Sequence, residues 1–523
     1  MSSAAAVTYE SKTKAAWIGA AFLCFTLLCA FCSGVLNSRG GEKKIFRLFR
    51  AALLCAFFVC GAGDFALYAA RYRSAAASGE YYVTARVEEA REYNTSVYLI
   101  LNDVSFDYRA ADGKLCMYVY QTNVPQGINA GSSVAFDAEI TANTQWKETR
   151  EGEEKTRAYE WRRDIKYEAT SCKNLRVTGE KRNLFENIRH RLKQTLDFAM
   201  DKDASALCMA ILTGETAEIN GELLDNFRYG GVAHIFAVSG LHVGALFAFV
   251  TAIFKKGRLA ALPSAVKWAV SAAVILFYGG ICGFSAGVIR ATVMCLVFYA
   301  DKLLGVKGDS LQSMGKAAII VLLLSPVSLF DAGFLLSFAA VAGILMLSPS
   351  FRRFFIDLLP KNRTERHGGG RDVSLGQSKA RVAAEKCLSY VSVTLAATLA
   401  TAPVLSVCFG YVSGVSLLLN MLIVPPVAAA FPLCLAVAFF SLIFAPLSQA
   451  AMYVPSALFS AVSTVFYAFD FSRFALEIPF SVTGVFGYYA ALFSLSEKLN
   501  FRYAFRVGVF AAGFAAFALS FFL

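Results

Sequence analysis

The chain has 523 residues, of which 57% are hydrophobic and 17% charged, and its mean hydropathy is +0.52. This composition excludes an ordinary soluble multidomain enzyme, and its many apolar runs predict a polytopic α-helical membrane protein. The net charge of +12 does not by itself indicate nucleic-acid binding, because membrane proteins concentrate Lys and Arg in their cytoplasmic loops.

Residues 1–70 are predicted to form two transmembrane helices, at residues 15–35 and 51–70. The connection between them carries five basic residues against Glu42 as its one acid. The positive-inside rule therefore places this connection in the cytoplasm and the segment after residue 70 outside it. The chain is expected to reside in the bacterial cytoplasmic (inner) membrane as a multi-pass protein.

Residues 79–178 differ from the rest because they contain five short, β-rich and partly alternating segments. The segments are 81–87, 96–101, 115–120, 133–140 and 165–169, with the clearest period of two at Val134, Phe136, Ala138 and Ile140. They predict an extracytoplasmic small β-barrel, with an OB-like barrel as the leading candidate. Residues 147–164 mix both charges and are expected to be a solvated helix or loop.

The charge of this β domain bears on its ligand. Residues 78–180 contain 13 Lys and Arg against 17 Asp and Glu, which is a net charge of −4. An OB barrel that grips single-stranded DNA normally has a basic groove with stacking aromatic residues. Tyrosines are present, but the bulk charge does not support DNA binding.

Cys116 and Cys172 are the two cysteines of this domain. In an extracytoplasmic domain they can form a disulfide, and the alternative is two buried free thiols. We favour the disulfide.

Residues 181–228 are predicted to be an amphipathic helical connector, which lies along the membrane surface rather than spanning it. Residues 230–523 then form the main transmembrane domain, which contains a basic cytoplasmic loop at 350–386. Asn420, Pro425 and Pro426 interrupt an apolar run that is too long for one span, so a broken or re-entrant helix is expected there. The whole chain fits about twelve crossings.

Few polar groups lie at membrane depth, and most of them belong to one stretch. Residues 230–245 contain His234, Ser239, Gly240 and His242, and Ser239 shares a helical face with His242 if the helix is regular. The other polar groups at this depth are Arg290, Asp331 and Asn420. Polar side chains inside a membrane point to function, although hydrogen bonding between helices is the alternative explanation.

These residues permit two kinds of chemistry. In an intramembrane hydrolase, Ser239 would be the nucleophile, His242 the base and Asp331 the orienting acid. In a conduit, the same groups would line a hydrated path between helices, which the glycines could help to open. A shared metal is not expected, because His234 and His242 are eight residues apart, roughly 12 Å along a regular helix. We therefore predict no metal and no cofactor.

The stretch His234-Ile-Phe-Ala-Val-Ser-Gly-Leu-His242 resembles the hallmark of the ComEC competence family. Further blocks resemble the same family in order: Leu212-Thr-Gly214, Arg290-Ala291, Ser325-Pro326, Asp331–Phe338 and Asn420–Pro425. The resemblance implies an inner-membrane channel, and not an enzyme, that admits transforming DNA as a single strand. His234, Ser239, Gly240, His242, Arg290, Asp331, Asn420 and Pro425 are then candidates for the pore or gate.

The departures from the family pattern also carry implications. Leu335 stands where many relatives have Gln, so one wall contact is expected to differ. The chain lacks a His-x-His-x-Asp-His pattern, so we expect a short form without the C-terminal metallo-β-lactamase-like domain of longer relatives. It also lacks a Walker A motif, so it is not expected to hydrolyse ATP.

The implied partners are single-stranded DNA, the lipid bilayer, a DNA receptor, a nuclease, and a cytoplasmic motor or strand-capturing protein. The alternative functions are a transporter for another solute and the intramembrane Ser/His hydrolase.

Overall fold

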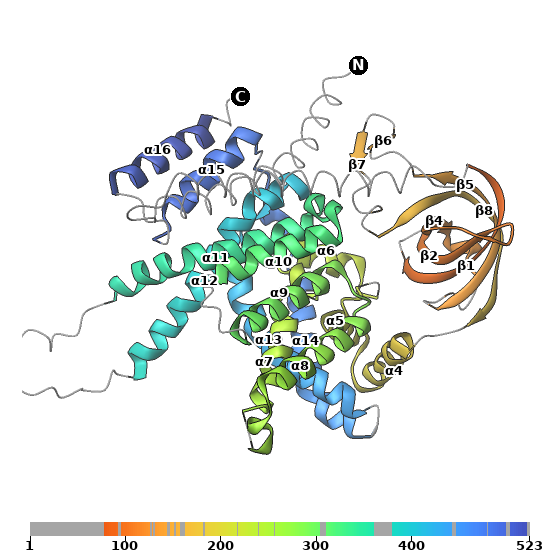
Figure 1. Cartoon of the computed structure of the whole chain (residues 1–523), viewed down its shortest axis with the longest axis horizontal. Helices are drawn as coiled ribbons and strands as arrows, with labels where there is room; N and C mark the ends of the chain where they lie inside the picture. The colour runs from red at the N-terminus through yellow and green to blue at the C-terminus, as the bar shows by residue number, and fades with distance from the viewer. Residues whose placement is uncertain are drawn as a thin grey trace, which may run out of the picture.

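The computed structural model describes residues 78–519 apart from gaps, the longest of which are 304–309, 360–378 and 498–502. The two spans predicted within residues 1–70 and the middle of the basic loop at 350–386 lie outside the described residues. The described part consists of a β-barrel at one side and a bundle of helices beside it (Figure 1).

Five long strands form a closed barrel in the order β1-β2-β4-β8-β5, since β1 pairs with both β2 and β5. β4 and β8 are parallel, and the other neighbours are antiparallel. All five predicted strands are present, in the Greek-key order of an OB-type barrel. The strands are β1 (Gly79–Glu92), β2 (Ser96–Phe106), β4 (Lys114–Tyr120), β5 (Ser132–Ala142) and β8 (Ile165–Glu180), with the short β3 (Arg109–Ala110) beside β2 and η1 (Gln121–Asn123) after β4.

The alternating side chains of β5 fill the barrel, as the sequence predicts. Val134, Phe136 and Ile140 are each 1% exposed, because successive side chains of a strand point to opposite faces. On β4 the alternation places Tyr118 and Tyr120 on the outer face, where they are 58% and 70% exposed.

Residues 147–164 are not the predicted helix or loop throughout, because they contain a hairpin of β6 (Lys147–Arg150) and β7 (Glu153–Thr156). Its register sets Glu148 opposite Lys155 and Arg150 opposite Glu153. Both four-residue strands consist of polar residues and show no alternation of apolar and polar positions, so the sequence pattern does not reveal them.

The predicted disulfide between Cys116 and Cys172 is wrong, because both residues are free thiols. Cys116 packs with Tyr98, Ile100 and Ile165 in a cluster separate from the barrel core. Cys172 instead packs against the core. The two thiols thus belong to opposite faces of the barrel wall.

Cys172 is expected to react slowly with alkylating reagents. Its burial, and after that the nearby Asp137 carboxylate, raise the pKa of the thiol to about 11. The thiolate is the reactive form, so the rate should rise about tenfold per pH unit between pH 7 and 9. Iodoacetamide labelling of the full chain, quantified on the peptide that contains Cys172, measures this rate. Asp137→Asn should speed labelling, whereas labelling as fast as that of the exposed Cys387 would contradict the expectation.

Three helices follow the barrel: α4 (Leu184–Ala199), α5 (Lys202–Thr213) and α6 (Gly221–Tyr229). α4 is amphipathic as predicted, with Leu192 and Leu196 buried and Phe198 63% exposed. The prediction of an amphipathic connector over residues 181–228 is wrong for α5, in which every residue from Ala204 to Thr213 is buried. α5 therefore lies inside the bundle rather than along its surface.

α4 also connects the barrel to the bundle. Arg86 of β1 forms an ion pair of 2.9 Å with Glu186. On its other side, Phe185 fills the space above Gly280, where a Cβ atom would lie 2.4 Å from the ring. The barrel is therefore held against the bundle by one charged and one apolar contact of the same helix.

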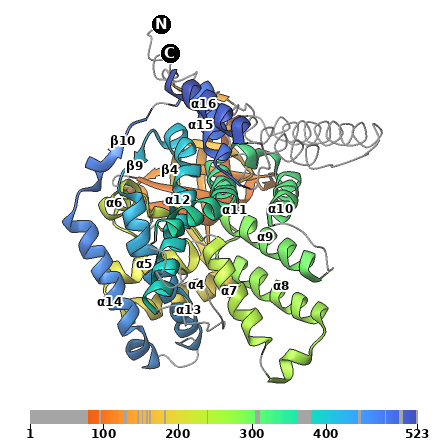
Figure 2. The same ribbon diagram turned by 90° about the vertical axis from the view of Figure 1, so that its left-hand side faces the viewer.

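Among the described residues, five bundle helices are long and apolar enough to cross a membrane: α8, α11, α12, α13 and α14. The count of about twelve crossings remains a prediction. Figure 2 shows α11 and α12 side by side, as are α15 and α16. The bounds are α7 (Gly240–Ile253), α8 (Ser264–Ile281), α9 (Ala286–Leu303), α10 (Ser310–Leu324), α11 (Ala332–Asp357), α12 (Lys379–Phe409), α13 (Ser416–Ser441), α14 (Pro446–Ala468), α15 (Val482–Ser494) and α16 (Tyr503–Leu519), with the 3-10 turns η2 (Ala233–Ile235), η3 (Gly257–Ala261), η4 (Pro326–Phe330) and η6 (Phe471–Phe474).

The broken or re-entrant helix expected at Asn420 and Pro425 is absent, because α13 is one continuous helix that includes Pro425, Pro426 and Pro432. Its 26 residues span roughly 39 Å. Proline is tolerated inside membrane helices because neighbouring helices can satisfy the freed carbonyl groups. The helix also begins at Ser416, after the strand β9 (Val412–Ser413), which shortens the apolar run.

β9 forms a two-stranded ribbon with β10 (Ala475–Leu476). The ribbon joins the connection between α12 and α13 to the segment that follows α14 and η6. Gly414 continues the pairing by donating its N–H to the carbonyl of Phe474 at 2.9 Å.

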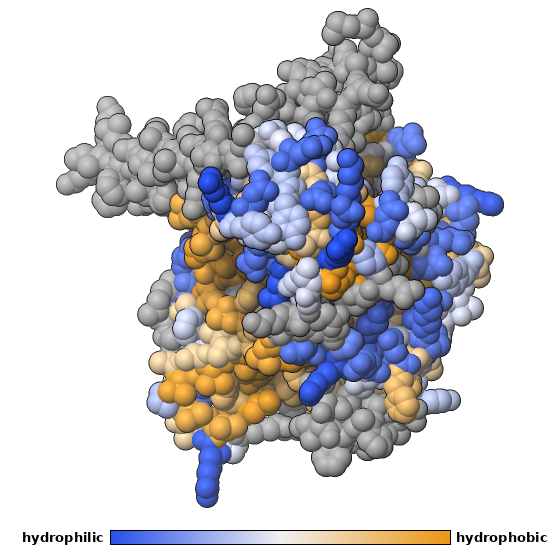
Figure 3. Space-filling model, turned by 90° about the vertical axis from the view of Figure 1, so that its right-hand side faces the viewer, coloured by the Kyte–Doolittle hydropathy of each residue, from blue (hydrophilic) through white to orange (hydrophobic). Residues whose placement is uncertain are grey.

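The surface is divided between polar and apolar regions. Hydrophilic residues cover much of the side that faces the viewer in Figure 3, whereas hydrophobic residues gather on its lower left flank. Large apolar side chains of the bundle are exposed, including Leu324, Leu422 and Val454 at 67–69%. Such exposure fits helices that face lipid.

Candidate pore segment and ion pair

The stretch that the sequence singles out contains an irregular connection between two helices. α6 ends at Tyr229, η2 makes a single turn, and α7 begins only at Gly240. Gly231 has φ +74°, a conformation that favours glycine and ends the helical path. We call residues 230–238 the unwound segment. Irregular backbone within a membrane bundle is tolerated only where it is buried in protein or lines a cavity.

Two glycines of the unwound segment contact α13 and α14. A Cβ atom at Gly230 would lie 2.9 Å from Leu419 and 3.2 Å from Phe466. A Cβ atom at Gly231 would lie 2.6 Å from Ser416. The start of the segment is therefore fixed against these two helices by close backbone approach.

The end of the unwound segment lies between α5 and α9, which each present a glycine to it. A Cβ atom at Gly214 would lie 3.3 Å from the side chain of Val238. A Cβ atom at Gly287 would lie 2.8 Å from the carbonyl oxygen of Val238. The sequence identified Gly214 and Val238 only as parts of family blocks and did not identify Gly287. A close approach that depends on the absence of a side chain leaves no recognisable pattern in the sequence.

The two histidines have different surroundings. His234 is exposed and forms a hydrogen bond with the backbone of Gly231. His242 is 1% exposed, and its ring packs edge-to-face on Phe431 with 4.7 Å between ring centroids. Gly240 begins α7, and Ser239 lies outside the described residues, so the proposed Ser239–His242–Asp331 arrangement remains a prediction. In the described part of the chain, no group of His, Cys, Asp and Glu could hold a metal.

Arg290 and Asp331 lie together. The Nη1 atom of Arg290 is 3.4 Å from Oδ2 of Asp331, and their side chains are 9% and 17% exposed. The same Oδ2 atom accepts a hydrogen bond from the backbone N–H of Phe334 at 3.2 Å and so caps α11. The sequence identified both residues but did not predict that they pair.

Asn420 lies in the second turn of α13, next to the Leu419 that contacts Gly230. Its backbone carbonyl accepts a hydrogen bond of 3.1 Å from Tyr390. Its side-chain oxygen is buried and has no hydrogen-bond partner among the described residues. Pro425 is on an exposed side of the same helix.

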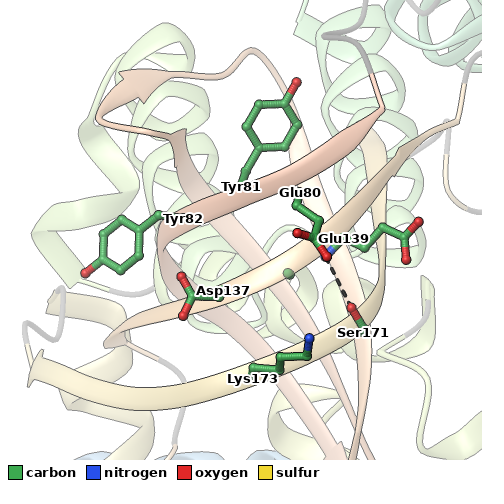
Figure 4. Close-up of a pocket in the computed structure, with 8 residues that line it drawn as sticks. Glu80, Tyr81, Tyr82, Asp137, Glu139, Ser171 and Lys173 are labelled. Atoms are coloured by element: carbon green, nitrogen blue, oxygen red, sulfur yellow. Dashed lines mark hydrogen bonds between the residues drawn. The ribbon is translucent and has the colours of Figure 1, made fainter.

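Figure 4 shows a shallow pocket of about 280 Å³ on the outer face of β1, β5 and β8. Glu80, Asp137 and Glu139 line it, with Lys173 as the cation among the lining residues. The backbone N–H of Glu139 donates to Ser171 at 3.4 Å. Because three carboxylates face one ammonium group, this side of the barrel does not suit a polyanion such as DNA.

Comparison with known proteins identifies a family and several relatives. A family model described as "Competence protein" matches residues 211–499. ComE operon protein 3 of Bacillus subtilis is 27% identical over 262 residues, which are 50% of this chain and 29% of the relative. Competence protein ComA of Neisseria gonorrhoeae is 31% identical over 148 residues, which are 27% of this chain and 21% of the relative.

An uncharacterized protein of Aquifex aeolicus is 27% identical over 174 residues, which are 33% of this chain and 40% of the relative. The chain therefore spans 21–40% of the length of the curated relatives that it matches. No solved structure matches the chain.

Proposed function

The chain belongs to the competence protein family, whose model covers more than half of it, and from that premise we propose that it acts in DNA uptake. In this proposal it is a channel that passes single-stranded DNA across the cytoplasmic membrane during natural transformation. The β-barrel lies on the extracytoplasmic side, and the basic loop at residues 350–386 lies in the cytoplasm.

The observation that carries the proposal is the unwound segment. It lies within the region that the family model matches, and both of its ends are fixed between helices through glycine contacts. Transport proteins commonly form substrate sites from discontinuous membrane helices, because unwound backbone offers polar groups at membrane depth. The exposed His234 belongs to this segment and is suited to contact a hydrated substrate.

Charge supports the same proposal. A DNA strand brings one negative charge per nucleotide. Arg290, in the second turn of α9, supplies a positive group. The acidic pocket of Figure 4 argues that the strand follows a path other than that face of the barrel. A nuclease, a DNA receptor and a motor or strand-capturing protein complete the proposed system.

The test is entry of a labelled single strand into liposomes that contain the purified chain, with a single-strand-binding protein sealed inside. His242→Ala is expected to reduce entry at least about tenfold, because it removes a packed ring at the start of α7. His190→Ala is the matched control, since His190 is an exposed residue of α4.

The outcomes separate the alternatives. Folded wild-type protein that admits no strand would remove the channel proposal, and equal entry by His242→Ala would remove His242 from it. Hydrolysis of an ester or peptide that is lost in Ser239→Ala would instead support the hydrolase. Entry of an uncharged solute without entry of DNA would support a transporter for another solute.

A further inference from the structure

The turn between α7 and α8 carries only positive charge. We call residues 255–267 the hairpin tip, and they contain four Lys and Arg and no Asp or Glu. Lys255 and Arg258 are exposed, and neither forms an ion pair within the part of the chain that the structure describes. A surface of this charge attracts anions, and nothing within the tip neutralises it.

Contacts within the chain hold the hairpin tip in place. Phe254, immediately before the tip, is 9% exposed and belongs to the core of the bundle. Leu262 of the tip packs against the same core. The Nζ atom of Lys267 donates a hydrogen bond of 2.7 Å to the carbonyl oxygen of Ala260 in η3. The positions of the backbone and of its cations are therefore set by the fold.

The hairpin tip lies at the end of α8 that is farther from the barrel connection. At the opposite end of α8, Gly280 contacts Phe185 of α4, the helix that follows the barrel. The 18 residues of α8 span roughly 27 Å, close to the thickness of the hydrocarbon core of a bilayer. Figures 1 and 2 show the α7–α8 hairpin extending to the lower end of the bundle. When α8 crosses the membrane, the tip therefore lies at the level of the lipid headgroups.

The two helices expose apolar side chains next to the charged tip. Exposed fractions of 41–56% are found for Phe249, Ile253, Leu259, Val266 and Val270. Cations beside such a surface suit a bilayer, in which phosphate groups lie next to acyl chains. Single-stranded DNA also offers phosphates, but it gains affinity by stacking its bases on aromatic side chains. Apart from Phe249 these exposed residues are aliphatic, which favours lipid over DNA.

We propose that the hairpin tip binds the headgroups of anionic phospholipids. Lys255 and Arg258 contact the phosphodiesters, while the apolar side chains of α7 and α8 lie among the acyl chains. The cytoplasmic leaflet is the anionic one, and assignment of the tip to it rests on the proposed orientation. Lipid binding itself does not depend on DNA transport. Because α7 follows the unwound segment, this contact anchors the far end of the helix into which that segment leads.

The test uses the full chain in phosphatidylcholine nanodiscs that contain a small fraction of a lipid with a photoreactive headgroup region. Mass spectrometry measures crosslinking to residues 255–267. Photoreactive phosphatidylglycerol is expected to give at least about fivefold more crosslink than photoreactive phosphatidylcholine, because each cation adds to the attraction. Lys255→Gln with Arg258→Gln should make the two yields equal. Lys173→Gln with Arg176→Gln is the matched control, since it removes one Lys and one Arg from exposed positions of the barrel.

Equal yields from the two lipids in the wild-type chain would overturn the proposal, as would a preference that survives in the tip variant. Raising NaCl from about 0.05 M to about 0.5 M should weaken the wild-type preference, because salt screens exposed charges, and this measurement needs no variant to fold. Loss of oligothymidylate binding in the tip variant, with the lipid preference unchanged, would assign the tip to nucleic acid instead. Strand entry into liposomes is recorded separately. Lipid preference without entry removes only the proposed function, and entry without lipid preference removes only this proposal.

Discussion

Replacing Gly287 by alanine is expected to reduce single-strand entry at least about tenfold and to lower the melting temperature of the chain. The new Cβ atom would lie 2.8 Å from the carbonyl oxygen of Val238. Because this oxygen belongs to the backbone, no change of side-chain rotamer can relieve the clash. Overpacking of this kind typically costs about 1–3 kcal/mol. The overpacking displaces the unwound segment, so the rate of strand entry should fall by a larger factor than the melting temperature alone would suggest. Liposome entry and thermal unfolding in detergent measure the two effects.

Gly315→Ala is the matched control. Gly315 is also in a bundle helix, and no described atom lies within 4 Å of the Cβ position there. Alanine favours helix, so this variant should be as stable as wild type or slightly more stable. If Gly287→Ala behaves like Gly315→Ala, the carbonyl of Val238 is not fixed by α9.

Gly343→Ala is expected to destabilise the chain by about 1–3 kcal/mol, because α11 and α12 pack closely at this point. A Cβ atom at Gly343 would lie 2.4 Å from the Cβ of Ala400 and 2.7 Å from the carbonyl oxygen of Ala396. Adding Ala400→Gly removes the first clash and leaves the second. The double variant should therefore recover part of the lost melting temperature but not all of it.

Ala400→Gly alone provides the control for this pair. It removes a methyl group from a fully buried position, so it should cost some stability by itself. A double variant that melts below both single variants would show that the two positions are not coupled through the clash.

The barrel could be predicted from sequence because its information is local. A strand that is half buried alternates, and the segment from Val134 to Ile140 shows this alternation without any knowledge of its neighbours. The hairpin of β6 and β7 was missed because both of its strands consist of polar residues, without the alternation that identifies a half-buried strand. The disulfide was wrong for a different reason, since the face on which each of Cys116 and Cys172 lies depends on how β4 and β8 are placed in the barrel.

For the candidate site, the sequence supplies candidate residues but not their pairing. Polar residues in apolar runs single out His234, His242, Arg290, Asp331 and Asn420, and their role in a pore or gate stays a prediction. The pairing of Arg290 with Asp331 joins residues 41 positions apart, so it follows from the packing of α9 and α11. The continuity of α13 was missed because prolines are read as helix breakers, whereas a packed membrane bundle tolerates them.

The ribbon of β9 and β10 has a mechanical consequence for the bundle. Backbone pairing at Val412 with Leu476 and at Ser413 with Ala475 resists sliding, since any shift must break it. The ribbon thus couples the connection between α12 and α13 to the segment after α14. We expect any movement of α12 relative to α14 to be smallest beside the ribbon.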